Sequence, residues 1–354
     1  MGPDAPGDGT FNVPVVDISG LWSGEPAAAR AVATAVDTAA RTVGFMQIAG
    51  HGIPAETEAG LTAALDAFFA LPMATKLGCR PASTSINRGY SPPRSERLSH
   101  SLGVYSPADL FEAFNVGVEA GEYPGLGLPE SYYADNIWPD EVVGFRAGVQ
   151  AWFAAARRLA ETMTEVFALA LGLPAGYFDA FQSHSLDVLR MNNYLVPADV
   201  TLEDGQVGMG AHTDYGIVTI LWADRVPGLQ ILDTAGRWHD VLPAPGALLV
   251  NLGDLLARWT NDRWTSTMHR VVPPRDAAGH LVRRRSAAYF HDGNVDAVIA
   301  CLPGCATAEN PARYEPVTIA DHLTVKLTGS RGLVLNAAAH EAARLRQSPD
   351  PPAG

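Results

Sequence analysis

Two histidines and one aspartate are the candidate metal ligands of this chain. His212 and Asp214 are separated by one residue, and His269 follows 269 − 214 = 55 positions later. Two imidazoles and one carboxylate form the facial triad that binds non-haem Fe(II) and leaves coordination positions open. A structural zinc site is usually closed by four ligands and often includes thiolate, and no cysteine lies near this set. The pattern therefore indicates oxidative chemistry, with positions left for a co-substrate and O2.

A second pair of residues has the chemistry to bind an anion. Arg284 and Ser286 lie two positions apart on a predicted strand over 283–291, so their side chains share one face. A guanidinium group binds a carboxylate through two N–H donors, and a neighbouring hydroxyl adds a third. An alternative is a solvated basic edge formed by Arg283, Arg284 and Arg285. The register of the strand decides between the two interpretations, since it determines which arginine points inward.

Longer stretches around these residues resemble a known enzyme family. The core stretches are His212–Leu221, Val226–Gln230, Val250–Asp254, His269–Val272 and Arg284-x-Ser286. Further stretches are Val13–Ile18, Gly44–Pro54, Asn87–Tyr90 and Asp109–Asn115. Together they resemble the 2-oxoglutarate/Fe(II)-dependent dioxygenases, in the branch of isopenicillin N synthase, from about residue 12 to about residue 330.

The resemblance implies a double-stranded β-helix (jelly-roll) core in a mainly β protein with flanking helices (α+β). It implies that Fe(II) is held by His212, Asp214 and His269. It also implies that Arg284 and Ser286 bind the C5 carboxylate of 2-oxoglutarate.

The strand Arg190–Tyr194 resembles the RxNxY strand of the same family. This makes Asn192 and Tyr194 further candidates for binding 2-oxoglutarate, although Leu195 stands where the family usually has proline. The distance from His269 to Arg284 is 284 − 269 = 15 positions, a little longer than in the family that the chain resembles. We place the extra residues in a hairpin turn over 275–280.

The implied reaction converts 2-oxoglutarate and O2 to succinate and CO2 while hydrogen is abstracted from a small-molecule substrate. Hydroxylation is the default outcome, and desaturation or cyclisation depends on the position of the substrate radical. Two alternatives stay open: an iron-dependent oxidase on the same scaffold that does not use 2-oxoglutarate, and a non-catalytic ligand-binding relative.

Four aromatic residues are candidate walls of the substrate pocket by resemblance, although each could equally belong to the core. These are Tyr90, Phe114, Trp222 and Phe290. Alternation from Ser286 along the predicted strand turns Phe290 toward the pocket and His291 away from it.

The second half of the chain has the pattern of a β structure that could position these groups. Strands are predicted over 187–196, 211–222, 229–233, 237–242, 246–251, 266–272 and 283–291. Their density is typical of a barrel or a jelly-roll sandwich. On a strand over 211–222, His212 and Asp214 would project from the same face and could bind one ion together.

The first half is predicted to be mostly helical. A short strand over 12–18 precedes helices over 26–43 and 55–70, and apolar spacing predicts a long helix within 140–171. Residues 79–140 are rich in Gly, Pro, Ser and Tyr and are interpreted as long loops, in which only the segment Asp109–Asn115 has an ordered pattern. We expect the loops over 79–135 and the segment after residue 320 to shape the pocket.

These elements suggest three regions. Residues 1–180 form an N-terminal, mostly helical region with substrate-contacting loops, and residues 181–330 form the oxygenase core. Residues 331–354 form a C-terminal tail, and the Pro/Gly-rich ends of the chain are expected to fray.

Composition narrows the class of partner. The chain has 354 residues, 47% of them hydrophobic, which is enough for a sizeable core. With 25 basic and 38 acidic residues the net charge is −13, which disfavours nucleic acid as a partner. No leader or membrane-spanning apolar run is evident in the sequence, so we expect a cytoplasmic protein that is a monomer or small homo-oligomer.

The three cysteines are an odd number, which fits a reducing compartment. Cys301 and Cys305 could bind a metal, but a pair without a second pair favours ordinary packing.

Overall fold

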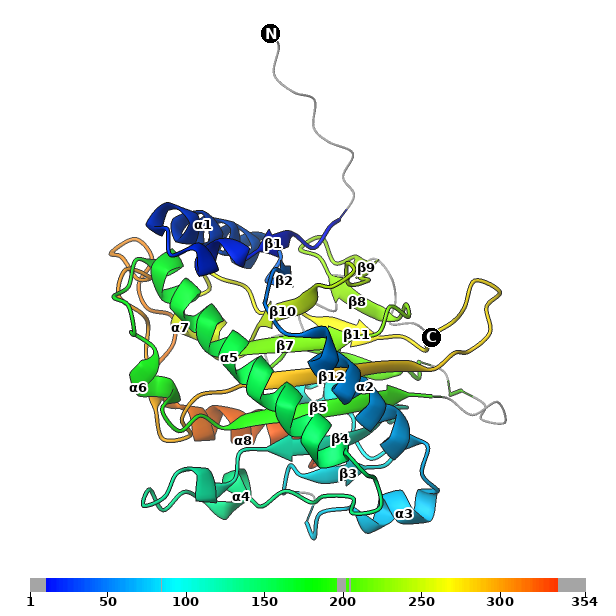
Figure 1. Ribbon diagram of the computed structural model, residues 1–354. Coiled ribbons are helices and arrows are strands. Elements are labelled where there is room, and N and C mark those ends of the chain that lie inside the picture. The colour runs from blue at the N-terminus through cyan, green and yellow to red at the C-terminus, as the bar shows by residue number, and fades with distance from the viewer. Residues whose placement is uncertain (1–10, 84, 196–201, 204, 337–354) are drawn as a thin grey trace.

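The computed structural model describes residues 11–83, 85–195, 202–203 and 205–336. Within these ranges the core consists of an eight-stranded and a four-stranded sheet, the two sheets of a double-stranded β-helix (Figure 1). The large sheet runs in the order β1 (Val15–Asp17), β2 (Phe45–Ala49), β10 (Leu248–Leu252), β7 (Val218–Ala223), β12 (Arg284–His291), β5 (Asp187–Tyr194), β4 (Glu112–Gly117) and β3 (Gly89–Ser91). The small sheet runs in the order β6 (Met209–His212), β11 (His269–Val271), β8 (Leu229–Leu232) and β9 (Trp238–Asp240).

Apolar side chains from both sheets share one core. Leu249 of the large sheet is buried with Leu229, Ile231 and Val271 of the small sheet. Burial of such side chains is the main driving force that holds the two sheets together. The separate pair β13 (Val298–Ile299) and β14 (Val317–Thr318) lies outside these sheets.

Three long helices from the first half of the chain pack together beside the large sheet. They are α1 (Pro26–Thr42), α2 (Ala55–Phe69) and α5 (Phe145–Leu171), and in Figure 1 α2 and α5 cross in front of the strands β7, β12 and β5. The buried positions of α5 recur at helical spacing, as in Val149, Trp152, Phe153 and Ala156, so one side of the helix faces the core. α5 ends at Gly172, whose φ of +71° is a left-handed conformation that favours glycine.

The remaining helices are short or lie late in the chain. They are η1 (Ser19–Ser23), α3 (Met73–Gly78), η2 (Leu98–Leu102), η3 (Ala120–Glu122), α4 (Glu130–Tyr133), α6 (Asp179–Gln182), α7 (Asp254–Trp259) and α8 (Ile319–Ser330). α8 begins after Thr318, whose hydroxyl accepts a hydrogen bond from the backbone N–H of Asp321. This N-cap stabilises α8.

The predicted helices over 26–43 and 55–70 are confirmed, and the long helix begins at Phe145. The ordered segment predicted at Asp109–Asn115 overlaps β4, but the prediction of loops over the rest of 79–140 was too simple, because β3 and several short helices lie there. The strand predicted over 211–222 is wrong. β6 ends at His212 and β7 begins at Val218, and the intervening loop carries the chain from the small sheet to the large one.

The hairpin predicted over 275–280 is present, closed by a bridge between Arg275 and Leu281. Strands β1 to β4 precede residue 180 and pair within the same sheet as β5, while the division of the chain at that residue stays a prediction. The predicted tail over 331–354 is described only to residue 336, and its remainder lies outside the described residues, as do residues 1–10.

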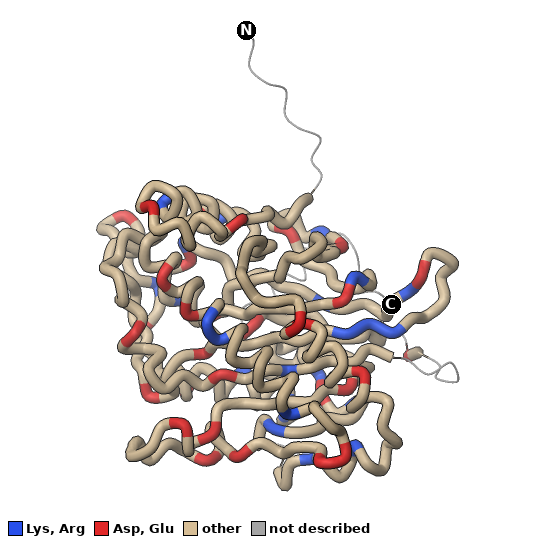
Figure 2. The backbone as a smooth tube through the Cα atoms, in the orientation of Figure 1, with Lys and Arg blue, Asp and Glu red and all other residues tan. Residues whose placement is uncertain are grey.

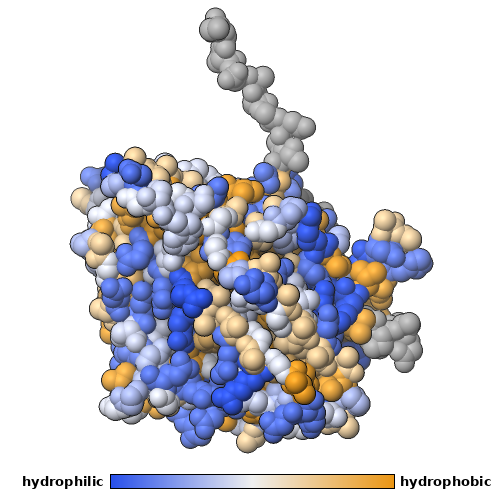
Figure 3. All heavy atoms as spheres, in the orientation of Figure 1, coloured by the Kyte–Doolittle hydropathy of each residue, from blue (hydrophilic) through white to orange (hydrophobic). Residues whose placement is uncertain are grey.

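Charged residues of both signs are dispersed over the chain trace in Figure 2. The face drawn in Figure 3 mixes hydrophilic and hydrophobic side chains. Among the helices in the described part of the chain, none has both the length and the apolar composition needed to cross a bilayer.

Candidate metal and co-substrate site

The three candidate metal ligands meet in the cavity between the two sheets. His212 ends β6 and His269 begins β11, and the two residues are direct partners in the antiparallel pairing of these strands. Asp214 lies in the loop after β6, and its Oδ1 is 3.8 Å from Nε2 of His212 and 3.7 Å from Nε2 of His269. The three ligand atoms lie within 4.8 Å of one another, so one ion can contact all of them.

Backbone carbonyl groups orient both imidazoles. Nδ1 of His212 is 2.8 Å from the carbonyl oxygen of Gly210, and Nδ1 of His269 is 3.0 Å from that of Thr267. A carbonyl oxygen only accepts, so each Nδ1 carries the proton and each Nε2 keeps its lone pair for a metal. Burial, together with the neighbouring His269, lowers the pKa of His212 to about 3, which keeps this imidazole neutral.

Two donors from the large sheet hold the carboxylate of Asp214. The hydroxyl of Thr219 on β7 and the side-chain amide of Asn251 on β10 both donate to Oδ2 of Asp214. Because Oδ2 is occupied, Oδ1 is the oxygen available to an ion. The sequence prediction identified the ligand but missed these two positioning residues, although both Thr219 and Asn251 belong to family-like stretches.

The donor set fits Fe(II), since two neutral imidazole nitrogens and one carboxylate oxygen leave half of an octahedron for other ligands. A search of the described residues for three or more acidic, histidine or cysteine side chains close enough to hold one metal ion gives this group. Cys301 and Cys305 are free thiols and belong to no such group.

Arg284 provides a buried, unpaired donor in the same cavity. It is 2% exposed, and its Nε and Nη1 find no hydrogen-bond acceptor within the described chain. Its guanidinium carbon lies 5.1 Å from the ring centroid of Tyr194, its direct partner on β5. A buried guanidinium group without an acceptor is costly, so this arrangement fits a carboxylate ligand such as that of 2-oxoglutarate.

The other predicted co-substrate residues line the same cavity. Ser286 and Asn192 are cross-strand partners, and the amide of Asn192 donates to the hydroxyl of Ser286 over 3.4 Å. Tyr194 also lines the cavity, and burial raises the pKa of its phenol, so it stays protonated.

The two arginines that flank Arg284 point away from the cavity, so the register of β12 places Arg284 alone of the three toward the cavity. Arg283 and Arg285 each form an ion pair of 2.7 Å with Asp66 on α2, and Arg285 also pairs with Asp224. The interpretation of a wholly solvated basic edge is therefore wrong, because the middle arginine of the three faces the cavity.

Of the four predicted aromatic walls, Phe290 lines the cavity. Tyr90 and Phe114 instead pack in the core against Phe68 of α2, with ring centroids 5.8 Å and 4.5 Å away. Trp222 is also in this core, and its indole N–H donates to Glu58 of α2 over 2.9 Å. These three face the helices because their strands turn them to the outer side of the large sheet.

His291 is buried and does not line the cavity. Its Nδ1 lies 2.9 Å from Asp187, and its Nε2 lies 3.0 Å from the side-chain oxygen of Gln182. The alternation that turns Phe290 inward and His291 away is therefore confirmed, and the imidazole joins β12 to β5 and α6.

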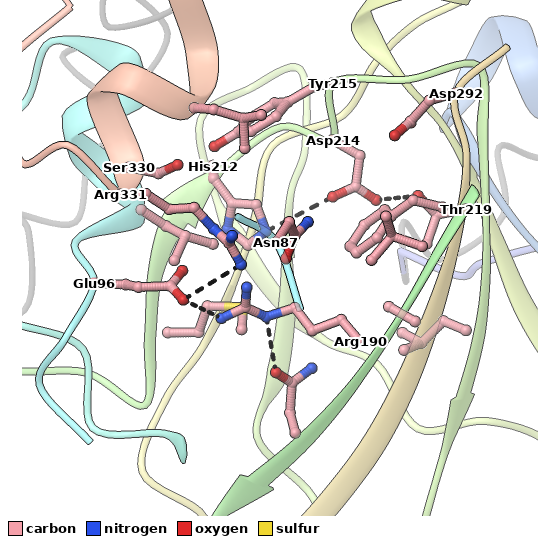
Figure 4. Close-up of a pocket in the computed structure, with 18 of the residues that line it drawn as sticks. Asn87, Glu96, Arg190, His212, Asp214, Tyr215, Thr219, Asp292, Ser330 and Arg331 are labelled. Atoms are coloured by element: carbon pink, nitrogen blue, oxygen red, sulfur yellow. Dashed lines mark hydrogen bonds and ion pairs between the residues drawn. The ribbon is translucent and has the colours of Figure 1, made fainter. Parts of the chain in front are cut away.

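Further polar residues line the cavity, and the sequence prediction did not single them out. These are Asn87, Arg88, Glu96, Arg190, Tyr215, Asp292, Ser330 and Arg331, several of which appear around the triad in Figure 4. They come from the 79–135 region, from β5 and the loops at the ends of β6 and β12, and from the C-terminal end of α8. The prediction that the early loops and the segment after residue 320 shape the pocket is thus confirmed.

The cavity has a volume of about 160 Å³ and combines these polar groups with apolar walls. Leu323 and Leu327 of α8 and Leu186 and Val188 around β5 contribute apolar surface. Burial, together with the nearby carboxylates of Asp187 and Asp214, raises the pKa of Asp292 well above its usual range.

Two family models match the chain. Residues 13–141 match the non-haem dioxygenase in morphine synthesis N-terminal family, and residues 186–293 match the 2OG-Fe(II) oxygenase superfamily. The two matches include the first two long helices and most strands of both sheets, as well as the metal and arginine positions described above.

Relatives and solved structures resemble the chain over most of their length. A 2-oxoglutarate-Fe(II) type oxidoreductase, hxnY, of Emericella nidulans is 35% identical over 91% of this chain and 89% of its own. The crystal structure of a full-length Neurospora crassa protein in complex with alpha-KG and thymine is 31% identical, with a TM-score of 0.78 over 89% of this chain and 96% of its own. A putative 2OG-Fe(II) oxygenase family protein from Caulobacter crescentus has a TM-score of 0.75 at 29% identity, over 90% of this chain and 99% of its own.

Proposed function

Because the chain belongs to the 2-oxoglutarate/Fe(II)-dependent oxygenases, we propose that His212, Asp214 and His269 hold its iron and that Arg284 and Ser286 bind 2-oxoglutarate. The protein is a non-haem iron dioxygenase that oxidises a small-molecule metabolite. When bound, iron, 2-oxoglutarate and O2 supply the oxidant, and succinate and CO2 are the co-products.

The observation that carries the residue assignment is the position of Arg284. Its unpaired N–H groups lie in the same buried cavity as the triad, so one ligand can contact both the ion and the guanidinium group. Ser286 lies two residues along the same strand, where its hydroxyl can donate to the same carboxylate.

The chain's own groups then have distinct tasks. The carbonyl groups behind His212 and His269 fix which ring nitrogen faces the ion, and Thr219 and Asn251 fix which oxygen of Asp214 does so. The apolar walls and the aromatic ring of Phe290 exclude water from the reacting region.

We further propose a cytoplasmic enzyme that acts as a monomer or small homo-oligomer and does not bind nucleic acid. Free thiols at all three cysteines support the cytoplasmic location, and the net charge of −13 supports the absence of nucleic-acid binding. Asn192 and Tyr194 are proposed as additional contacts to 2-oxoglutarate, because both line the cavity next to Ser286 and Arg284.

The experiment that tests the function is succinate formation from 2-oxoglutarate in the presence of Fe(II), ascorbate and O2, with a metabolite panel as substrate. We expect succinate to form, and to be lost in His212→Ala and in Arg284→Ala. Substrate-dependent O2 uptake that is indifferent to 2-oxoglutarate would instead support the oxidase alternative. Full turnover in either variant would refute the residue assignment.

A further inference from the structure

A cluster of three charged residues lines the cavity beside the triad, and the proposed function assigns none of them a role. Nη2 of Arg190 on β5 lies 2.9 Å from Oε1 of Glu96. Nη2 of Arg331, which follows α8, lies 3.8 Å from the same oxygen. Figure 4 shows the guanidinium groups of Arg190 and Arg331 both facing the carboxylate of Glu96.

Arg331 is the member of this cluster with an unmet donor. Its Nη2 finds no hydrogen-bond acceptor within the described chain, and its side chain is only 12% exposed. The ion pair with Glu96 is too long for a hydrogen bond. A nearly buried guanidinium group with an unmet donor indicates that a ligand supplies the acceptor.

The charges around this cluster favour an anionic acceptor. Arg190 and Arg331 share one carboxylate, Glu96, whose pKa is lowered below its usual range by these two arginines despite burial. The next acid, Asp109, accepts hydrogen bonds of 2.8 Å from the backbone N–H groups of Leu98 and Gly210, so its oxygens are already committed. Burial raises the pKa of Asp109 to about 7.

The cavity next to this cluster is suited to an apolar or aromatic body. Tyr215 and Phe290 contribute rings, and Leu323 and Leu327 of α8 contribute aliphatic side chains. Asn87, whose side-chain oxygen also has no hydrogen-bond partner in the described chain, adds a polar group beside Arg331 (Figure 4). A ligand here would bury its apolar part against these walls while its acceptor meets the guanidinium group.

We propose that Arg331 binds a carboxylate of the primary substrate, so that the substrates of this enzyme are small carboxylic acids with an apolar or aromatic body. The inference rests on the proposed function and names the substrate class for the same site. Arg331 acts as a specificity-determining residue, while Glu96 holds Arg331 and Arg190 toward the cavity.

The test uses matched sets of small metabolites, each a carboxylic acid with its primary amide and its methyl ester, in the succinate assay with the full-length enzyme. We expect the acids to stimulate succinate formation most. In Arg331→Gln, kcat/KM for the best acid should fall about 100-fold, while kcat/KM for its amide changes much less, because a neutral glutamine can still pair with an amide. The acid-to-amide ratio is the decisive readout, since a merely structural loss would lower both values together.

Two controls make the outcome interpretable. Arg331→Lys keeps the charge and should retain a preference for the acid, whereas Arg313→Gln, at an exposed ion pair with Asp262, should leave the ratio unchanged. Stimulation by amides or esters but by no acid, or an unchanged ratio in Arg331→Gln, would overturn the inference. Anaerobic binding of 2-oxoglutarate to the wild-type protein distinguishes the failure of this inference from the failure of the proposed function. If the protein binds 2-oxoglutarate but shows no preference for acids, the substrate class is refuted and the proposed function stands.

Discussion

His212 and His269 face each other across the adjacent strands β6 and β11, with their ring centroids 4.3 Å apart. The small sheet therefore brings together two ligands that are far apart in sequence. We predict that His269→Ala lowers Fe(II) affinity by about 100-fold or more, because it removes one of three protein ligands. Anaerobic Fe(II) titration measures this, with His280→Ala as the control, since His280 is 78% exposed in the hairpin. Equal iron binding by the two variants would contradict the ligand assignment.

Asp214 depends on its two donors for its orientation. Asn251→Ala should weaken Fe(II) binding by about 10–100-fold, because one of the two hydrogen bonds to Oδ2 is lost and Oδ1 is no longer held toward the ion. Thr219→Val should have a similar effect, and Thr219→Ser, which keeps the hydroxyl, should restore affinity. If Thr219→Ser is as weak as Thr219→Val, the role of this hydroxyl is disproved.

Arg284 and Arg283 offer a matched pair of substitutions on the two faces of one strand. Arg284→Gln should raise the dissociation constant of 2-oxoglutarate by about 10–100-fold, because hydrogen bonds to a charged group contribute about 1.5–3 kcal/mol. Arg283→Gln, which breaks the ion pair with Asp66 and the hydrogen bond to Asn193 on the outer face, should leave this constant within about twofold. Calorimetric titration of 2-oxoglutarate into the metal-loaded protein compares them, and equal effects would argue against the assignment of Arg284.

Phe114 and Phe290 test the distinction between core and cavity. Phe114 is fully buried against Phe68 and Phe145, so Phe114→Ala should lower the free energy of unfolding by about 3–5 kcal/mol. Phe290 lines the cavity and is only half-buried, so Phe290→Ala should change KM for the substrate more than stability. Urea unfolding and steady-state kinetics provide the two readouts. The placement fails if Phe114→Ala alters KM while the protein stays as stable as wild type.

The sequence predicted those parts of the site that depend on local alternation. Arg284, Ser286 and Phe290 are spaced by even numbers of residues on one strand, so a correct strand assignment puts all three on the same face, and β12 has this arrangement. Tyr90 and Phe114 could not be assigned in the same way, because alternation does not say which face of their strands meets the helices and which meets the cavity.

The sequence could not show how the chain moves between sheets. His212 and Asp214 were expected to share a strand, but the strand ends at His212 and the loop carries Asp214 to its donors on the large sheet. Arg331 was assigned to a tail, although Thr318 and Asp321 form a capping pattern that could have indicated α8. Its approach to Glu96 depends on packing between segments 331 − 96 = 235 residues apart, which no local pattern reports.

The most direct test of the account is an anaerobic titration of 2-oxoglutarate into the Fe(II)-loaded protein, followed by visible absorption. We predict that a weak charge-transfer band appears and saturates at one 2-oxoglutarate per chain in the wild-type protein. In His212→Ala the band should be absent. A wild-type protein that binds Fe(II) but develops no band with 2-oxoglutarate would contradict the claim that this cavity holds both.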